Sequence, residues 1–200
     1  LKTLTADSIS VMVRSMRFAE QSGLQLDDLY LRLVGNHQGA TLVNFRLDMP
    51  HSALRLDTVW MSYSADDFTN SLIVKGAVLP SHVTLSDVGS LIPAVKEMDE
   101  SIHFRAEGIG SASRINIKSL ALYTHHRDLT LQAHGMAQWG QSLDLNLEML
   151  GVTSRCWNLI AEQIPSLYAS IPTEVTRIGA IAASGTAHIG RADSHIKLMA

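Results

Sequence analysis

The sequence predicts an all-β protein: a long, mainly antiparallel, twisted sheet that curls into an open trough, with two short helical inserts. Apolar and polar residues alternate with a period of two over most of the 200 residues, which is typical of strands with one buried and one solvated face. The intervening turns are short enough for hairpins. Two short helices cannot cover the apolar face of about a dozen strands, so the sheet must curl, pair as a sandwich or close into a barrel.

The alternation is clearest between residues 101 and 150. Apolar side chains there are expected to share one face of the sheet, with polar residues between them on the other face. At Ser119 the phase shifts by one position, so that Leu120 and Leu122 continue the apolar face, as at a β-bulge. The residues predicted to line the apolar groove are Ile102, Phe104, Ile115, Ile117, Leu129, Leu131, Leu143, Leu145, Leu147 and Met149.

Strands of the same kind are expected in the first hundred residues. Gly23 separates the first two segments, and Pro50 ends the third because proline cannot donate a ladder hydrogen bond. Asp57 marks a break within the fourth segment, and residues 64–70 are expected to form a polar loop. The expected segments are 9–19, 24–33, 42–49, 54–63 and 72–79, and a late strand is expected at 178–189.

Two segments depart from the strand pattern and predict short helices. Residues 86–92 and 153–164 each begin with a capping residue and end before a proline. Ser86 and either Thr153 or Ser154 are the expected caps. The apolar side chains expected to be buried against the sheet are Ile92, Trp157, Leu159 and Ile160.

Composition excludes several classes of protein. The net charge of −3 gives no basic surface, so nucleic acid is not an expected partner. Cys156 is the one cysteine, which excludes an intrachain disulfide, and it is expected to be a small buried residue. No run approaches the ~20 apolar residues of a membrane-spanning helix, and no signal-peptide pattern occurs. We expect residues 1–200 to form one β-rich domain, excised from a longer, repetitive protein.

The sequence contains no recognisable catalytic or metal-binding motif. Its nine histidines lack metal-ligand spacing, so His125, His126 and His134 are interpreted as solvated turn residues. Residues 108–113 begin like a dinucleotide-binding fingerprint but lack its third glycine and precede a strand, which favours a hairpin turn. We therefore predict no catalytic residue, metal or cofactor, and we do not expect the protein to be an enzyme.

Three stretches carry a resemblance to a known family. They are FAEQSGLQLDDL at 18–29, DMPHSALRL at 48–56 and LPSHVTLSDVGSLIP at 79–93, and the strand run 102–150 and the unit 178–187 fit as well. These stretches resemble the AsmA-like envelope proteins, in particular the TamB group (translocation and assembly module proteins) in its Bacteroidetes form. The resemblance implies a segment of a U-folded β structure with an apolar inner groove, called a β-taco.

The resemblance also implies where the protein works and with what. The parent would be anchored in the inner membrane and span the periplasm, with membrane contacts made by parts outside this chain. It would carry phospholipid towards the outer membrane, or assist the insertion of outer-membrane barrels through an outer-membrane assembly protein. Neither partner contact can be assigned to residues of this chain.

The apolar stripe leaves three functional hypotheses open, besides a plain packed core. Flexible aliphatic and methionine side chains, without helices to cover them, favour a lipid conduit that contacts phospholipid acyl chains. The alternative is a scaffold segment that presents a sheet edge or groove to a nascent barrel strand by β-augmentation. A carbohydrate-binding domain is disfavoured because Trp60, Trp139 and Trp157 are dispersed and form no aromatic platform.

Overall fold

The computed structural model describes residues 8–199 except 22, 65, 93–94, 97, 157, 159–178 and 191–193. The protein is all-β, with 65% of the described residues in strands and two short helices. Its main element is one antiparallel sheet of 12 strands, and a separate two-stranded sheet lies beside it. The predicted fold class is therefore confirmed.

The strands and helices have the following bounds. The main sheet contains β1 (Ile9–Val13), β4 (Asp28–Gly35), β5 (Gly39–Asp48), β6 (Ala53–Arg55), β7 (Val59–Ser62), β8 (Ile73–Thr84), β9 (Ser101–Ser111), β10 (Arg114–Thr124), β11 (Leu129–Gln138), β12 (Ser142–Val152), β13 (Ile181–Gly190) and β14 (Ser194–Met199). The small sheet pairs β2 (Phe18–Ala19) with β3 (Gln25–Leu26). The helices are α1 (Phe68–Ser71) and the 3₁₀-helix η1 (Leu85–Val88).

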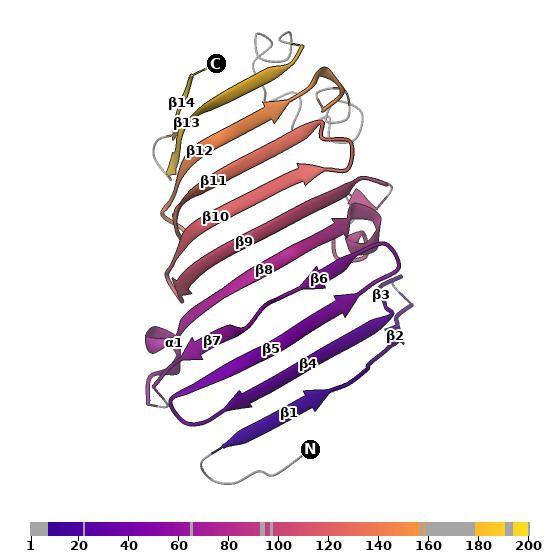
Figure 1. Cartoon of the computed structure of the whole chain (residues 1–200), viewed down its shortest axis with the longest axis vertical. Coiled ribbons are helices and arrows are strands. Elements are labelled where there is room, and N and C mark those ends of the chain that lie inside the picture. The colour runs from indigo at the N-terminus through magenta and orange to yellow at the C-terminus, as the bar shows by residue number, and fades with distance from the viewer. Residues whose placement is uncertain are drawn as a thin grey trace.

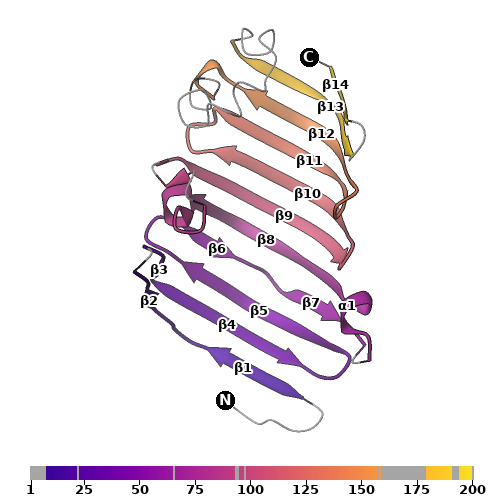
Figure 2. The ribbon, with the colours of Figure 1, turned by 180° about the vertical axis from the view of Figure 1, so that it is seen from behind.

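The strands of the main sheet follow one another in chain order from β1 to β14. β6 and β7 lie in succession between β5 and β8, with residues 56–58 between them. Figures 1 and 2 show the strands stacked along the long axis, with α1 and η1 at the lateral margins of the sheet. No pairing joins β1 to β14 among the described strands, so the sheet is open. This excludes a closed barrel over these residues.

The register places one set of aliphatic side chains on a single face, because directly opposed residues in an antiparallel pair point to the same side. Leu122, for example, is opposite Leu131, which is opposite Leu150. We call this side the apolar face and the other side the polar face. The apolar face includes Val11, Val13, Leu29, Leu33, Leu42, Leu47, Leu54, Val59, Met61, Val74, Val78, Val83, Ile102, Phe104, Ala106, Ile115, Ile117, Leu120, Leu122, Leu131, Ala133, Ala137, Leu143, Leu145, Leu147, Leu150, Val152, Ile181, Ala183, Ala187 and Ile189.

β-bulges keep the long strands in phase with this face. The register of β10 shifts between Ile117 and Leu120 against β11, and between Ile117 and Ser119 against β9. The bulge predicted at Ser119 is therefore confirmed. β8 shifts between Val78 and Ser81, where Pro80 cannot donate a ladder hydrogen bond. A bulge is the position at which a long strand tolerates that missing donor.

The first predicted helix is shorter and less buried than expected. The segment forms the 3₁₀-helix η1, whose cap residue is Thr84 rather than Ser86, without a side-chain capping bond. Ile92 is 53% exposed, so its expected burial against the sheet is wrong. The Asp87 carboxylate, which could have supported the first turn, accepts instead from the His51 backbone N–H at 2.9 Å and from the Ser52 hydroxyl at 2.6 Å.

The second predicted helix is only partly described. Residues 154–156 are helical, and the Cys156 N–H donates to the Thr153 carbonyl at 3.0 Å. Trp157, Leu159 and Ile160 lie outside the described residues. The polar loop expected at residues 64–70 contains α1, which the Asp67 side chain caps by accepting from the Asn70 backbone N–H at 3.3 Å.

The sheet has little core for its size. The chain exposes 12883 Å², whereas a compact monomer of 21.8 kDa is expected to expose about 9,300 Å². Its one cluster of buried apolar residues consists, among the described residues, of Ala133, Leu147 and Ala187, with Leu131 and Leu145 packed against it. These residues come from neighbouring strands, so burial arises within one layer.

Stability should depend on the close approach of backbones at Gly135. A Cβ placed there would lie 2.0 Å from the Asp144 carbonyl oxygen. We expect Gly135→Ala to lower the free energy of unfolding by about 1–3 kcal/mol, because the two strands would have to separate. Urea titration measures this loss. Gly179→Ala is the control, since no atom lies within 4 Å of that position, and equal losses in both variants would contradict the explanation.

Candidate functional site

The structure brings almost all of the predicted groove residues together on the apolar face. Ile102 and Phe104 lie in β9, and Ile115 and Ile117 lie in the neighbouring β10. Leu129 and Leu131 follow in β11. Leu143, Leu145 and Leu147 follow in β12, opposite Ala137, Gly135 and Ala133. These residues therefore form one contiguous surface across four neighbouring strands.

Met149 is the exception, and its predicted place on this face is wrong. The register of β12 shifts between Leu147 and Leu150, so Met149 lies opposite Gln132 on the polar face. Leu150 takes the place on the apolar face, opposite Leu131 and Ala183. The sequence alternates without interruption from Leu143 to Met149, but in the structure an extra residue after Leu147 breaks this alternation.

Large and small side chains alternate from strand to strand across the apolar face. Isoleucines of β10 and leucines of β12 stand on either side of Ala133, Gly135 and Ala137 in β11. Beyond β12, the sequence repeats this pattern with Ala183, Gly185 and Ala187 in β13. The large side chains of β10 and β12 form raised rows on this surface, and the small residues of β11 and β13 form lower rows beside them. Every residue named here is apolar or glycine.

The apolar face has no second layer over it in the described part of the chain. Every extensive contact between described elements joins neighbouring strands or joins η1 to β8. Ala133 and Leu147 are only 2% and 6% exposed, but most leucines and isoleucines of this face remain half-buried. Their remaining exposure is therefore to solvent or to whatever the protein binds.

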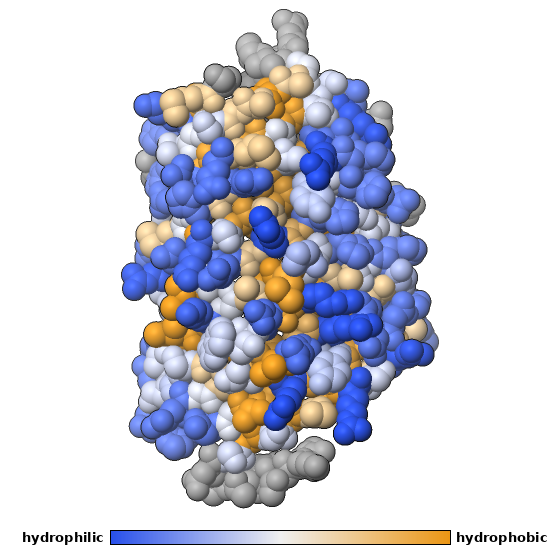
Figure 3. All heavy atoms as spheres, viewed as in Figure 1, coloured by the Kyte–Doolittle hydropathy of each residue, from blue (hydrophilic) through white to orange (hydrophobic). Residues whose placement is uncertain are grey.

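The polar face carries two clusters of titratable side chains. Figure 3, drawn from this side, shows polar side chains along both margins and apolar atoms in a band between them. The exposed apolar side chains of this face include Val34, Trp60, Ile73, Ile109, Met136 and Met149. The two clusters differ in whether their polar groups are paired.

The first cluster, in β11 to β13, is paired internally. His134 Nδ1 lies 3.0 Å from Glu148 Oε1, and Asn146 Nδ2 lies 3.2 Å from His134 Nε2. His188 contacts the Asp144 carboxylate, and this hydrogen bond holds the pKa of Asp144 below its usual value. Each charged group named here has a protein partner. The interpretation of His134 as a solvated turn residue is therefore wrong, because this residue lies within β11 and its ring contacts Glu148 and Asn146.

The second cluster forms a cross-strand row of rings on the polar face. His82, His103 and Tyr123 are directly opposed in β8, β9 and β10. The rings of His103 and Tyr123 are stacked, with centroids 5.0 Å apart and planes 4° apart. The Arg127 guanidinium lies 5.6 Å from the Tyr123 ring centroid. We call these residues, with Arg105, the His–Tyr–Arg cluster.

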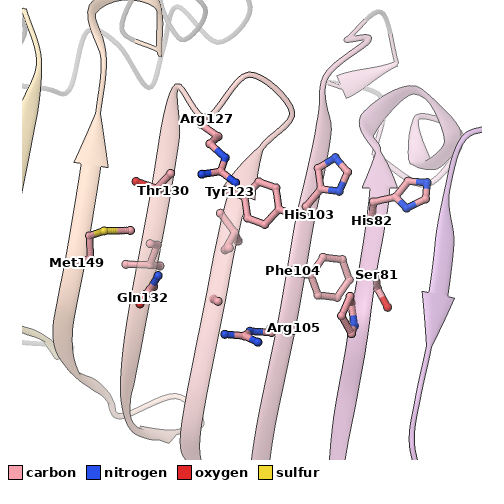
Figure 4. Close-up of a pocket in the computed structure, with 14 residues that line it drawn as sticks. Ser81, His82, His103, Phe104, Arg105, Tyr123, Arg127, Thr130, Gln132 and Met149 are labelled. Carbon is pink, nitrogen blue, oxygen red and sulfur yellow. The ribbon is translucent and has the colours of Figure 1, made fainter.

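A hollow of about 370 Å³ opens beside this cluster. Figure 4 shows Arg105 reaching over β10 from β9, Arg127 entering from the β10–β11 turn, and Tyr123 between them. Thr130 and Gln132 of β11 complete the opposite wall. Sequence reasoning missed this cluster, because its members become neighbours only through the register of three strands, of which β8 and β10 contain bulges.

The environment of His103 disfavours its charged form. Burial lowers the pKa of His103, the nearby His82 and His125 lower it further, and Glu100 opposes them. His103 is therefore held neutral to lower pH than an exposed histidine. Cys156 is buried as expected, and that burial raises the pKa of its thiol.

Among the described residues, no group of three or more histidine, cysteine, aspartate or glutamate side chains is arranged to hold a metal ion. None of the described helices is long and apolar enough to cross a membrane. Comparison with family models, with curated proteins and with solved structures finds no match to this chain. Function must therefore be inferred from the two faces of the sheet.

The depressed pKa of His103 predicts a pH-dependent stability. The unfolded chain binds a proton at His103 more readily than the folded protein does. The contribution of His103 to the free energy of unfolding is therefore full above the ordinary pKa of about 6.5, and it is lost as the pH falls through the lower pKa of the folded state. We expect the free energy of unfolding to fall less between about pH 7.5 and about pH 5 in His103→Gln than in the wild type. Urea titrations at both pH values measure the difference, and His37→Gln, in the exposed β4–β5 turn, is the control. An unchanged pH dependence in His103→Gln would contradict the argument.

Proposed function

We propose that this chain is a non-enzymatic segment of a periplasm-spanning protein whose apolar face conducts phospholipid between the inner and outer membranes. The observation that carries the proposal is one continuous aliphatic face over a 12-stranded open sheet, without a covering layer among the described elements. Monomeric proteins rarely leave so large an apolar surface exposed unless it binds something.

The chemistry of the face suits acyl chains better than other apolar ligands. Its strand positions carry mainly leucine, isoleucine, valine, alanine and glycine, and no charged side chain in the described strands. The exceptions include Phe104 and the hydroxyl residues Ser81 and Thr124. Each methylene removed from water contributes about 0.8 kcal/mol, whichever aliphatic neighbours it meets. Binding without directional contacts allows a chain to slide, which a conduit requires.

The dimensions of the face also support transport rather than a single binding site. The twelve strands form eleven rows, because β6 and β7 share one row, and a spacing of about 4.8 Å makes a surface roughly 50 Å long. This exceeds the length of one extended acyl chain, so a lipid would occupy successive positions. Polar head groups would remain in water at the margins of the sheet, where the turns lie.

A second candidate is a scaffold that assists assembly of outer-membrane barrels. β1 and β14 are the edges of the sheet, and each pairs on one side only among the described strands. An unpaired edge can take up an extended segment of another protein by β-augmentation. This function would use the edge backbone, whereas the lipid conduit uses side chains of the apolar face.

The lipid proposal predicts the behaviour of Leu145→Asp in the full-length parent. Leu145 is half-buried on the apolar face, opposite Gly135 and Ala187. Lipid tails cannot solvate a carboxylate there, so we expect the variant to fold with a modest loss of stability and to lose lipid crosslinking from a photoreactive residue at Leu131. Circular dichroism and urea titration measure folding, and mass spectrometry of crosslinked lipid measures contact.

Asn146→Asp is the matched control for this experiment. It places the same charge on the adjacent residue of β12, on the polar face opposite His134, and should leave crosslinking at the wild-type level. If Leu145→Asp unfolds the protein, the face is a sealed core. The free-energy cost of burying an unpaired carboxylate would then exceed the few kcal/mol by which the folded state is stable. A folded Leu145→Asp variant that crosslinks lipid at the wild-type level would end the conduit hypothesis.

A further inference from the structure

The His–Tyr–Arg cluster lies on the face that the proposed function does not use. Acyl chains on the apolar face are separated from it by the thickness of the sheet. Its hollow is lined by two arginines and two histidines, and by no carboxylate. The same lining includes Tyr123, Thr130 and Gln132, whose side chains add neutral hydrogen-bonding groups.

Five polar side chains of this hollow have no hydrogen-bond or ion-pair partner among the described residues, whereas the Ser81 hydroxyl donates to the Leu79 carbonyl at 2.8 Å. Arg105, Arg127, Tyr123, Thr130 and Gln132 form no side-chain hydrogen bond or ion pair with any described residue. The neighbouring cluster around His134 differs, because its histidines are bonded to Glu148 and Asp144. Two guanidinium groups directed to one hollow without a carboxylate make a surface that attracts an anion.

The hollow exists because of one small residue. Ala121 lies between Arg105 of β9 and Gln132 of β11 in the same cross-strand row. Its methyl group forms a low floor, while the longer side chains on either side form the walls. The next row along the strands contains His103, Tyr123 and Thr130, which close one end.

The turn that carries Arg127 is fixed in a sterically unfavourable conformation. Arg127 has φ +58°, in the left-handed region where residues with a Cβ are uncommon. Its N–H donates to the Thr124 carbonyl at 2.9 Å, and the Leu129 N–H donates to the Thr124 hydroxyl at 3.1 Å. The buried Asp128 accepts from the Thr153 hydroxyl at 2.8 Å. These bonds hold the guanidinium over Tyr123.

We propose that this hollow binds a phosphate-type oxyanion, held between the guanidinium groups of Arg105 and Arg127 above Ala121. Arginine pairs with phosphate through parallel N–H donors, which suits two guanidiniums approaching from different strands. The Tyr123 hydroxyl and the His82 and His103 rings supply further donors. The anion would be a free phosphate or the phosphate of a lipid head group presented from outside.

Titration of inorganic phosphate into the whole chain at constant ionic strength tests the proposal. Histidine side-chain NMR should show a saturable change at His103, and phosphate should raise the pKa of His103 because a bound dianion favours its protonated form. The other charged or titratable groups facing this ring are His82, His125, Glu100, Tyr123, Arg105 and Arg127. The absence of a saturable change would overturn the proposal.

Variants separate a built site from general surface charge. Arg105→Gln and Arg127→Gln should each weaken phosphate binding about tenfold, as expected for loss of a charged hydrogen-bond partner. Arg114→Gln removes the same charge from the same face of β10, outside the hollow, and should leave binding unchanged. Ala121→Trp should abolish binding by filling the hollow while keeping both arginines. Equal weakening in Arg114→Gln, or wild-type binding in Ala121→Trp, would overturn the proposal.

Vesicles distinguish the two sources of the anion. If the ligand is a lipid head group, the wild type should co-sediment with phosphatidylglycerol vesicles more than with phosphatidylcholine vesicles, and Arg105→Gln and Arg127→Gln should reduce that difference while Arg114→Gln does not. If the ligand is a free phosphate, these variants should co-sediment like the wild type while phosphate binding weakens. Either result supports the site. Both results leave the lipid conduit untouched, because that proposal is tested by Leu145→Asp on the opposite face.

Discussion

The antiparallel register is the constraint on which the rest of the structure depends. Successive side chains of a strand point to opposite faces. A strand displaced by one position would therefore place its aliphatic side chains on the polar face and its charged side chains on the apolar face. The hairpin turns fix the register locally, and bulges at Ile117–Leu120 and Leu147–Leu150 restore it in strands of eleven residues. Both faces, and therefore both proposed sites, follow from this single alignment.

A sheet without a second layer must be stabilised differently from a sandwich. Its buried residues, such as Ala133 and Leu147, are shielded by neighbours in the same sheet rather than by an opposing layer. The backbone hydrogen bonds between strands and the cross-strand side-chain pairs also stabilise the sheet. One such pair is Lys118 with Glu107, at 2.8 Å on the polar face. This arrangement leaves the apolar face available, and it explains why the surface area is large for the mass.

The sequence predicts the sheet and most of the apolar face, because a period of two is visible wherever polar residues separate apolar ones. The bulge at Ser119 could be predicted because Lys118 and Ser119 are consecutive polar residues that interrupt the alternation. The bulge near Glu148 could not, because Met149 and Leu150 are both apolar and either one continues the pattern. The His–Tyr–Arg cluster requires knowledge of which residues oppose each other across three strands. The length of the helix expected from Ser86 was overestimated. The Asp87 side chain, which the sequence suggests as support for the first turn, instead accepts a hydrogen bond from Ser52, which is distant in the sequence.

The strict chain order of the strands has a consequence for how the molecule unfolds. The extensive contacts of each described strand are with its neighbours in the ladder, so stability is expected to be a sum of nearest-neighbour terms, as in descriptions of repeat proteins. Amide exchange should therefore form a gradient, fast at β1 and β14 and slowest around β10 to β12. Such a ladder can gain or lose a hairpin at its ends without rearranging the rest, so its length is a variable that evolution can adjust independently of its cross-section.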